Sequence, residues 1–204
     1  MKYLKLFENF NKSIRYELLK LLEIDDICEK YNIKKYTVNP NGSVDVNGDV
    51  YLYNKYLTEL PLKFNKVTGS FDCRFNDLTN LEGCPNYVGW DFQCSYNKLT
   101  SLEDSPSYIN RDFWFDNNAL TTLEGYPKEI GGRDFRYSGN PIAPIINLFK
   151  FDLKIYLEYQ ETYNFLRKDC KIVKHRLIEA LNDFNEYYNK QVELPEKIEG
   201  YTYI

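Results

Sequence analysis

A 21-residue period dominates this chain of 204 residues. Segments 73–85 (CRFNDLTNLEGCP), 94–106 (CSYNKLTSLEDSP) and 115–127 (FDNNALTTLEGYP) are near copies of one another. Leucine or isoleucine recurs at intervals of 21, 21, 21 and 22 residues in two registers, at Leu57, Leu78, Leu99, Leu120 and Ile142, and at Leu60, Leu81, Leu102, Leu123 and Ile145. A fixed period of this length is typical of repeat proteins, so it constrains the fold more than any other feature.

Each repeat also carries an asparagine two residues before the first leucine, and an apolar pair at alternate positions before it. The asparagines are Asn76, Asn97, Asn118 and Asn140. The apolar pairs are Phe71/Cys73, Phe92/Cys94, Phe113/Phe115 and Phe135/Tyr137, with Val50/Leu52 as a looser first copy. Alternating apolar residues predict a short strand with one buried side, and the asparagine predicts a turn in which its side chain bonds backbone groups.

These units are expected to stack, because one unit cannot bury its own apolar face. About 21 residues are too few for a strand and a full helix, so the outer side of each coil is predicted to be extended or turn-like. The predicted fold is an α/β repeat, a solenoid of about five coils with a parallel sheet at residues 48–146. Helical caps are expected at residues 1–47 and 147–204, the first of them including a β-hairpin.

The flanks carry helical patterns. Residues 3–22 show an apolar stripe made by Leu4, Phe7, Phe10, Ile14, Leu18 and Leu21 or Leu22. Asp26 with Glu29 resembles a capping box that opens a second short helix, and residues 36–52 predict short strands joined by Asn-Gly turns. Toward the C-terminus, one helix is expected at about 150–167, and another carries Val173, Leu177, Leu181, Phe184 and Tyr188. The final residues, 201–204, predict a terminal strand or a segment docked on these helices.

The pattern apolar-x-apolar-x-x-Asn-x-Leu-x-x-Leu resembles the leucine-rich repeat, in a short form similar to that of bacterial type III secreted effectors. The glycine-containing returns, the opening YLKLFENF and the closing LPEKIEGYTYI also resemble leucine-rich-repeat-like proteins encoded by tailed phages. The sequence departs from the pattern at Lys55, which replaces the first asparagine, and in its Phe, Cys and Tyr strand residues. The resemblance implies a viral or bacterial accessory protein without a known active site, located in the host cytoplasm if phage-encoded.

Composition and motif content disfavour several classes of protein function. A net charge of −4 without a basic stripe disfavours nucleic-acid binding, and no apolar run is long enough to predict a membrane span. Charges at Lys2, Lys5 and Glu8 disfavour a signal peptide, so a cytoplasmic protein is expected. We expect no enzyme, because the chain has no Gly-rich phosphate loop, no G-x-S-x-G and no Cys-x-Asp, the motif of the ligase domain in the effectors it resembles.

Cysteine usage favours reduced thiols, since an odd number without a secretion signal does not fit a disulfide framework. The five are Cys28, Cys73, Cys84, Cys94 and Cys170. Cys73 and Cys94 share a repeat position with Phe115 and Tyr137, which predicts a buried apolar slot. With His175 as the only histidine, neither a metal nor a cofactor is expected.

If the apolar pairs face inward, the residues between and beside them form outward rows with many aromatic and arginine side chains. Such residues are enriched in binding hot spots, although they can also shield a sheet or contact the caps. The predicted partner-binding residues are Tyr51, Tyr53, Asp72, Arg74, Phe75, Gln93, Tyr96, Asp112, Trp114, Asp116 and Arg136. Five strands about 4.8 Å apart form a small surface, which suits a peptide, a loop or a small ligand.

Further alternatives stay open. The row Asp49, Asp91, Asp112 and Asp134 is either an acidic stripe for a basic partner or cation, or local turn chemistry, with Arg111 and Arg133 placed to neutralise it. Besides protein or peptide binding, the chain could sequester a small anionic or aromatic ligand on Arg74, Trp114 and Arg136. It could also be a structural component that assembles through its C-terminal helices. The sequence does not predict an oligomeric state.

Overall fold

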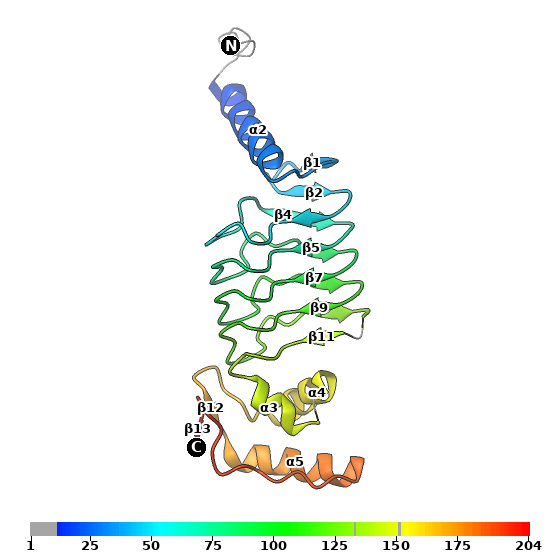
Figure 1. Cartoon of the computed structure of the whole chain (residues 1–204), viewed down its shortest axis with the longest axis vertical. Helices are drawn as coiled ribbons and strands as arrows, with labels where there is room; N and C mark the ends of the chain where they lie inside the picture. Colours follow the sequence, from blue (N-terminus) through cyan, green and yellow to red (C-terminus); the bar gives the residue numbers. More distant parts are fainter. Residues whose placement is uncertain (1–11, 133, 151) are drawn as a thin grey trace.

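Short strands stack in a straight column with helices at both ends (Figure 1). The computed structural model describes residues 12–132, 134–150 and 152–204, with side chains from residue 18 onward. Helix α2 (Lys12–Lys30) stands at one end of the column. Helices α3 (Ala143–Leu148), α4 (Leu153–Tyr163) and α5 (Lys174–Tyr188) lie at the other.

Two sheets run the length of the column. Sheet A has the order β1 (Tyr36–Val38), β2 (Val44–Val46), β4 (Phe64–Val67), β6 (Tyr87–Val88), β8 (Tyr108–Ile109) and β10 (Glu129–Ile130). Sheet B has the order β11 (Phe135–Arg136), β9 (Phe113–Trp114), β7 (Phe92–Gln93), β5 (Phe71–Asp72) and β3 (Val50–Tyr51). All neighbours are parallel except β1 and β2, which form an antiparallel hairpin. The chain is therefore a parallel β-solenoid with helices at both ends.

The solenoid has about four turns of about 21 residues, where five coils were expected. Five strands of sheet B enclose four complete turns, because the chain leaves the stack after β11. Ile142 and Ile145 occupy the leucine positions of a further repeat, but they lie at the start of α3. Pro144 stands in the first turn of that helix, a position where its fixed φ angle favours helical backbone.

The outer side of each coil is more ordered than the expected extended or turn-like return, because it forms sheet A. Its inward residues recur at 21-residue intervals, at Val46, Val67, Val88, Ile109 and Ile130. This register is a signal in the sequence that predicts a second strand in each repeat. A single core therefore lies between the two sheets and the leucine rows.

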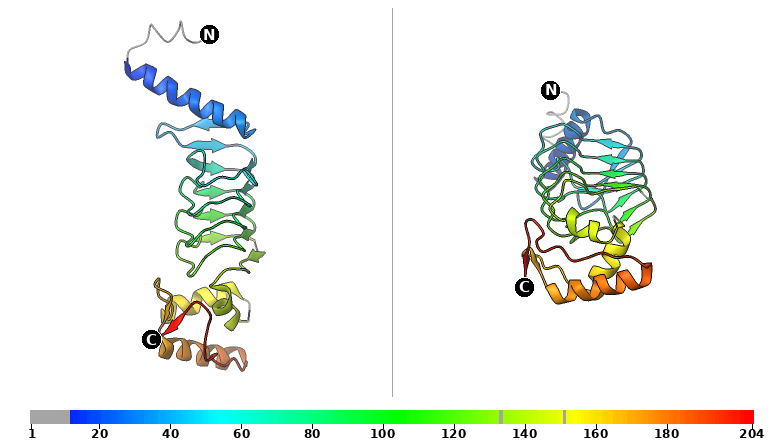
Figure 2. Two further views of the ribbon diagram at one scale, coloured as in Figure 1. Left: turned by 60° about the vertical axis from the view of Figure 1, so that its left-hand side comes forward. Right: turned by 60° about the horizontal axis from the view of Figure 1, so that its bottom comes forward.

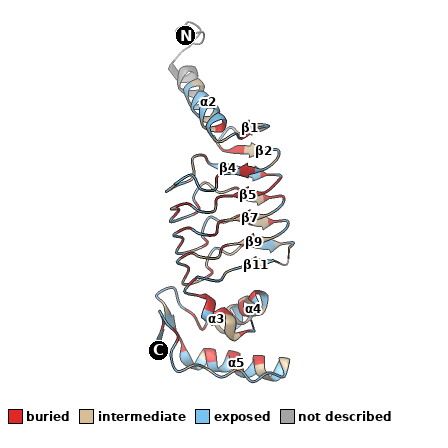
Figure 3. Cartoon of the chain, in the orientation of Figure 1, coloured by how far each residue is buried: buried red, intermediate tan, exposed pale blue. Residues whose placement is uncertain are grey.

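The predicted burial of the apolar pairs is confirmed in the first four strands of sheet B. Phe92 and Cys94 have no exposed surface, whereas Gln93 between them is only half-buried. Figure 3 shows the burial of the whole chain in the orientation of Figure 1. In the last strand, Phe135 and Tyr137 are half-buried instead of buried. The leucine rows are buried from Leu78 onward, and Leu57 and Leu60 of the first repeat are partly exposed.

The asparagines join adjacent turns, as the buried-turn prediction requires. The Asn97 amide donates to the carbonyls of Cys73 and Cys94 at 3.0 and 3.1 Å, and its oxygen accepts from the Leu78 N–H at 3.0 Å. The equivalent bonds are made in the other turns by Asn76, Asn118 and Asn140. Each buried turn is therefore hydrogen-bonded through a side chain of the next repeat.

The N-terminal region differs from the prediction. Asp26 and Glu29 lie inside α2 rather than at a helix start, because no glycine or proline interrupts residues 12–30. Leu21 and Leu22 are 41% and 39% exposed, so they do not pack against the column. Of the expected stripe, Leu4, Phe7 and Phe10 and the side chain of Ile14 lie outside the described residues.

The two predicted Asn-Gly turns have different roles. Gly42, with φ of +80°, lies in the turn of the β1–β2 hairpin. Gly48, with φ of +139°, lies in a corner where the chain passes from sheet A to sheet B. The strand β2, within the predicted N-terminal cap, already pairs with β4 of the solenoid.

The C-terminal helices agree with the predicted stripes, since α5 buries Leu177, Leu181 and Phe184. Residues 202–203 form β13, which pairs in parallel with β12 (Lys171–Ile172), as the expected terminal strand (Figure 2). The Tyr201 hydroxyl donates to the Thr121 carbonyl at 2.7 Å and joins this region to the solenoid. Among the described residues, no helix has the length and apolarity needed to cross a membrane.

Candidate functional site

Four aromatic side chains of the predicted site are about half exposed. Tyr51, Tyr53, Phe75 and Tyr96 are 52%, 50%, 47% and 47% exposed. Arg136 is exposed, and half-buried positions are occupied by Arg74, Gln93, Asp112, Trp114 and Asp116. Since the helices stand at the ends of the column, they leave the outer side of sheet B open (Figure 1). The column is straight, so this surface is flat rather than concave.

The row that contains Phe75 and Tyr96 is a ladder of left-handed turns, not a row of strand residues. Its members all have positive φ angles between 53° and 69°, at Asn54, Phe75, Tyr96, Asn117 and Gly139. Phe75 and Tyr96 stack with ring centroids 4.5 Å apart and planes 13° apart. Bulky residues rarely adopt this backbone conformation, so the two exposed rings occupy strained positions.

Asp72 was predicted to face solvent, but it is buried, with 3% of its surface exposed. Its two oxygens accept from Arg74, from Nε at 2.9 Å and from Nη2 at 2.7 Å. The Arg74 N–H also donates to Asp72 at 3.1 Å. This pairing satisfies the buried carboxylate, and it raises the pKa of the Arg74 guanidinium.

Trp114 lies between two arginines. The Arg136 guanidinium is 3.8 Å from the Trp114 ring centroid, and that of Arg74 is 5.6 Å from it. The Trp114 Nε1 donates to Asp134 at 3.1 Å, and Arg136 pairs with the same carboxylate at 3.3 Å. Both guanidinium groups are thus held by internal ion pairs and cation–π contacts, which reduces their capacity to bind an anionic ligand.

The aspartate row connects successive turns through main-chain bonds. Asp49 accepts from the Ser70 N–H at 2.7 Å, Asp91 from the Asp112 N–H at 3.2 Å, and Asp112 from the Asp134 N–H at 3.2 Å. The geometry therefore favours turn chemistry, acting between turns, over an acidic stripe for a ligand. Arg111 lies over the Trp90 ring at 5.7 Å, and Arg133 is outside the described residues.

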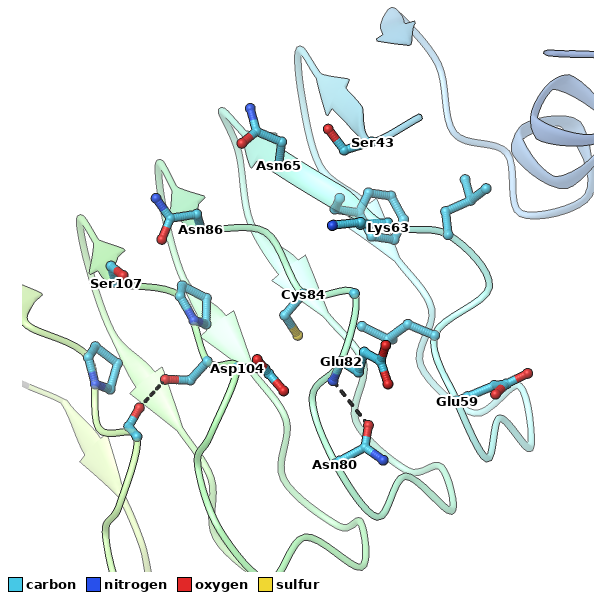
Figure 4. A pocket seen from close by; sticks show the side chains of 18 of the residues that line it. Ser43, Glu59, Lys63, Asn65, Asn80, Glu82, Cys84, Asn86, Asp104 and Ser107 are labelled. Carbon is cyan, nitrogen blue, oxygen red and sulfur yellow. Dashed lines mark hydrogen bonds between the residues drawn. The ribbon is translucent and has the colours of Figure 1, made fainter. Parts of the chain in front are cut away.

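A long groove, which the sequence reasoning missed, follows the coil returns (Figure 4). Its volume is about 980 Å³, and it crosses residues 59–65, 80–86, 104–107 and 125–128. Glu59, Glu82 and Asp104 contribute carboxylates to it, and Cys84 lies in its wall. Asp104 has a φ of +63° at the position that glycine occupies in two other turns. The glycine-proline returns were the available sequence signal for this groove.

The cysteines are free thiols. Cys73 and Cys94 occupy the predicted buried slots, and burial raises the pKa of both thiols. His175 is exposed on α5, and no group of three His, Cys, Asp or Glu side chains in the described ranges is arranged to hold a metal ion.

No family model, curated protein or solved structure matches the chain. The leucine-rich-repeat and phage relationships consequently stay predictions, and the functional reading depends on the geometry described above.

Proposed function

We propose that the protein is a non-catalytic binding module that holds a protein loop or extended peptide on the outer side of sheet B. The observation that carries this proposal is the set of four half-exposed aromatic side chains, Tyr51, Tyr53, Phe75 and Tyr96. Large aromatic rings at fixed positions are typical of binding hot spots, since they bury much area and lose few rotamers on binding.

The size of the surface limits the partner. Five strands about 4.8 Å apart span roughly 24 Å, which matches about seven residues of extended peptide at about 3.4 Å each. A folded partner would bring such a loop and add contacts on the helices. The stacked Phe75 and Tyr96 rings, 4.5 Å apart, offer a continuous apolar contact for one aromatic or aliphatic side chain.

The small-ligand alternative has less support, because Arg74 and Arg136 already contact Trp114 and pair with aspartates. We also propose that the protein works in the cytoplasm as a bacterial or phage accessory protein. This part of the proposal depends on the sequence resemblance, to which the charge and composition add support.

The direct test is affinity capture from lysate with mass spectrometry, using the full chain and a Phe75→Ala/Tyr96→Ala variant. We expect a stoichiometric protein partner that the double variant loses, because truncating one hot-spot aromatic costs about 2 kcal/mol or more, about 30-fold in Kd. Tyr187→Ala is the matched control, since Tyr187 is 80% exposed on α5, away from this surface.

Two other outcomes would point elsewhere. Thermal stabilisation by a metabolite pool, with no protein captured, would favour ligand sequestration. Concentration-dependent mass in light scattering that Ile178→Asp abolishes would favour assembly through α5, where Ile178 is 39% exposed.

A further inference from the structure

Main-chain hydrogen bonds in sheet B repeat from turn to turn. The N–H of the first inward residue donates to a carbonyl of the next turn at 2.9–3.2 Å, from Val50 to Ser70, Phe71 to Asp91, Phe92 to Asp112 and Phe113 to Asp134. Phe135 holds the same place in β11, the last strand of the sheet. Its N–H donates to no other described residue. Within the described part of the chain, the fifth donor of the series therefore has no acceptor in a following turn.

The Phe135 carbonyl also points away from the sheet. The carbonyls of β11 that accept from β9 are those of Asp134 and Arg136, on either side of it. Because successive peptide groups of a strand point in opposite directions, the Phe135 N–H and C=O both belong to the open edge. An open edge of this kind is a template for another strand.

The inward side chains of β11 are incompletely covered as well. Both inward residues are fully buried in each of the four preceding strands, at Val50/Leu52, Phe71/Cys73, Phe92/Cys94 and Phe113/Phe115. Phe135 and Tyr137 are only half-buried. Each turn of a solenoid is covered by the next, so this difference marks the end of the stack. The contact that α4 makes with Phe135 there is with the Lys154 side chain, whose Nζ lies 5.9 Å from the ring centroid.

A cavity of about 510 Å³ lies beside this edge, between the last turn and α3. Phe135 and Tyr137 line it from the strand, and Ala143, Pro144 and Asn147 line it from the helix. The Tyr137 hydroxyl donates to the Asn147 side-chain oxygen at 3.2 Å and joins the strand to the helix. The exposed surface of this cavity is mainly apolar, although Asp116, Arg136 and Ser138 also line it, and α3 forms its far wall.

We propose that the β11 edge binds an extended segment of a partner protein by β-strand addition, as a sixth strand of sheet B. The segment carries two apolar residues at alternate positions, which cover Phe135 and Tyr137 and enter the cavity. Its main chain accepts from the Phe135 N–H and donates to the Phe135 carbonyl. In the parallel register of sheet B, a second copy of this chain could pair with the β11 edge only through its β3 strand, and α2 stands at that end (Figure 1). Antiparallel pairing of two β11 edges is the competing arrangement, and self-association would reveal it. This edge is separate from the aromatic side chains of the proposed function and does not depend on them.

The chain itself supplies a suitable probe. A synthetic peptide of residues 111–118, RDFWFDNN, has phenylalanines at alternate positions and forms β9 in the intact stack. Titrated into the full chain, it is expected to bind saturably and to slow hydrogen exchange at the Phe135 amide at least about tenfold. In the parallel register of this sheet, the peptide's tryptophan N–H donates to the Phe135 carbonyl. N-methylation of that tryptophan is therefore expected to weaken binding about tenfold or more.

Two variants of the protein make the test specific. Phe135→Lys places an inward charge on the edge, which is a natural means of blocking strand pairing, and should abolish binding. Phe135→Leu keeps the apolar contact and should still bind the peptide. If Phe135→Lys does not fold, the comparison of the two peptides decides alone.

Four results would overturn the proposal: no binding of the parent peptide up to about 1 mM; equal affinity of the parent and N-methylated peptides; binding without any change at the Phe135 amide; or self-association of the chain that protects this amide without peptide.

Discussion

Replacement of Asn97 by alanine tests the hydrogen-bonding scheme that joins the turns. Its amide donates to the Cys73 and Cys94 carbonyls and, at the longer distance of 3.4 Å, to the Ser95 carbonyl, and its oxygen accepts from the Leu78 N–H. The Cys73 and Cys94 carbonyls keep a second donor in the variant, because Asn76 and Asn118 also bond to them. The Leu78 N–H has no such replacement and would be left buried without a partner.

The expected loss follows from the three shorter bonds, to Cys73, Cys94 and Leu78. A buried, unpaired N–H costs about 1–3 kcal/mol, and each of the other two bonds contributes about 0.5–1.5 kcal/mol net. Asn97→Ala should therefore lower the free energy of unfolding by about 2–6 kcal/mol. That is a large share of the roughly 5–15 kcal/mol that stabilises a typical domain.

The assay is urea denaturation followed by circular dichroism, together with hydrogen exchange at the Leu78 amide. Lys98→Ala is the neighbouring control, since Lys98 makes only an exposed ion pair with Asp77 at 2.8 Å and should lose less than about 1 kcal/mol. Asn97→Asp should be at least as harmful as alanine at neutral pH, because it keeps the acceptor but sets a carboxylate against two carbonyls. A loss below about 1 kcal/mol for Asn97→Ala, with unchanged Leu78 exchange, would refute the scheme.

Three other predictions concern the corners, the buried ion pair and one thiol. Gly89→Ala should destabilise by about 3 kcal/mol or more, because the added Cβ would lie 2.1 Å from a main-chain oxygen of the preceding turn. A Cβ added at Gly42 would have no atom within 4 Å, but the residue has a φ of +80°, so Gly42→Ala should lose only about 1 kcal/mol. Equal losses for the Gly89 and Gly42 variants in thermal unfolding would contradict this reasoning. Asp72→Asn should lower the free energy of unfolding in urea by about 1–2 kcal/mol. This loss is smaller than that from breaking a fully buried ion pair, because the Arg74 side chain keeps 29% exposure. An unchanged urea midpoint would argue against a stabilising role for the Asp72–Arg74 pair. Burial raises the pKa of Cys28 from 9.0 to about 11, so the folded state keeps this proton to a higher pH than the unfolded state. The free energy of unfolding should therefore fall between pH 9 and pH 11. The same fall with pH in Cys28→Ala would exclude this thiol as its cause.

Much of the solenoid follows from short-range patterns in the sequence. The inward orientation of Phe92 and Cys94, the linking role of Asn97 and the burial of Leu99 each follow from a residue type repeated at one position. Repetition makes such predictions strong, because the same local interaction must be satisfied in every turn. The C-terminal stripe around Leu177 was detectable for a related reason, since a helix repeats its buried side every 3.6 residues.

Other features were decided by the tertiary structure. Sheet A is an intermediate case. Its strands β6 and β8 contain only two residues each, so alternation within a strand could not reveal them, but the 21-residue spacing of Val88 and Ile109 marks their positions in the sequence. The burial of Asp72 depends on Arg74 folding back across it. The end of the stack at Phe135 depends on where the helices begin.

What the sequence by itself determined is the coil, whose contacts lie about 21 residues apart and recur in every repeat. Only the tertiary structure decided how the coil ends and which outward side chains stay exposed. These properties depend on neighbours that occur once, such as Ala143 and Asn147 beside Tyr137, and a single occurrence leaves no period in the sequence.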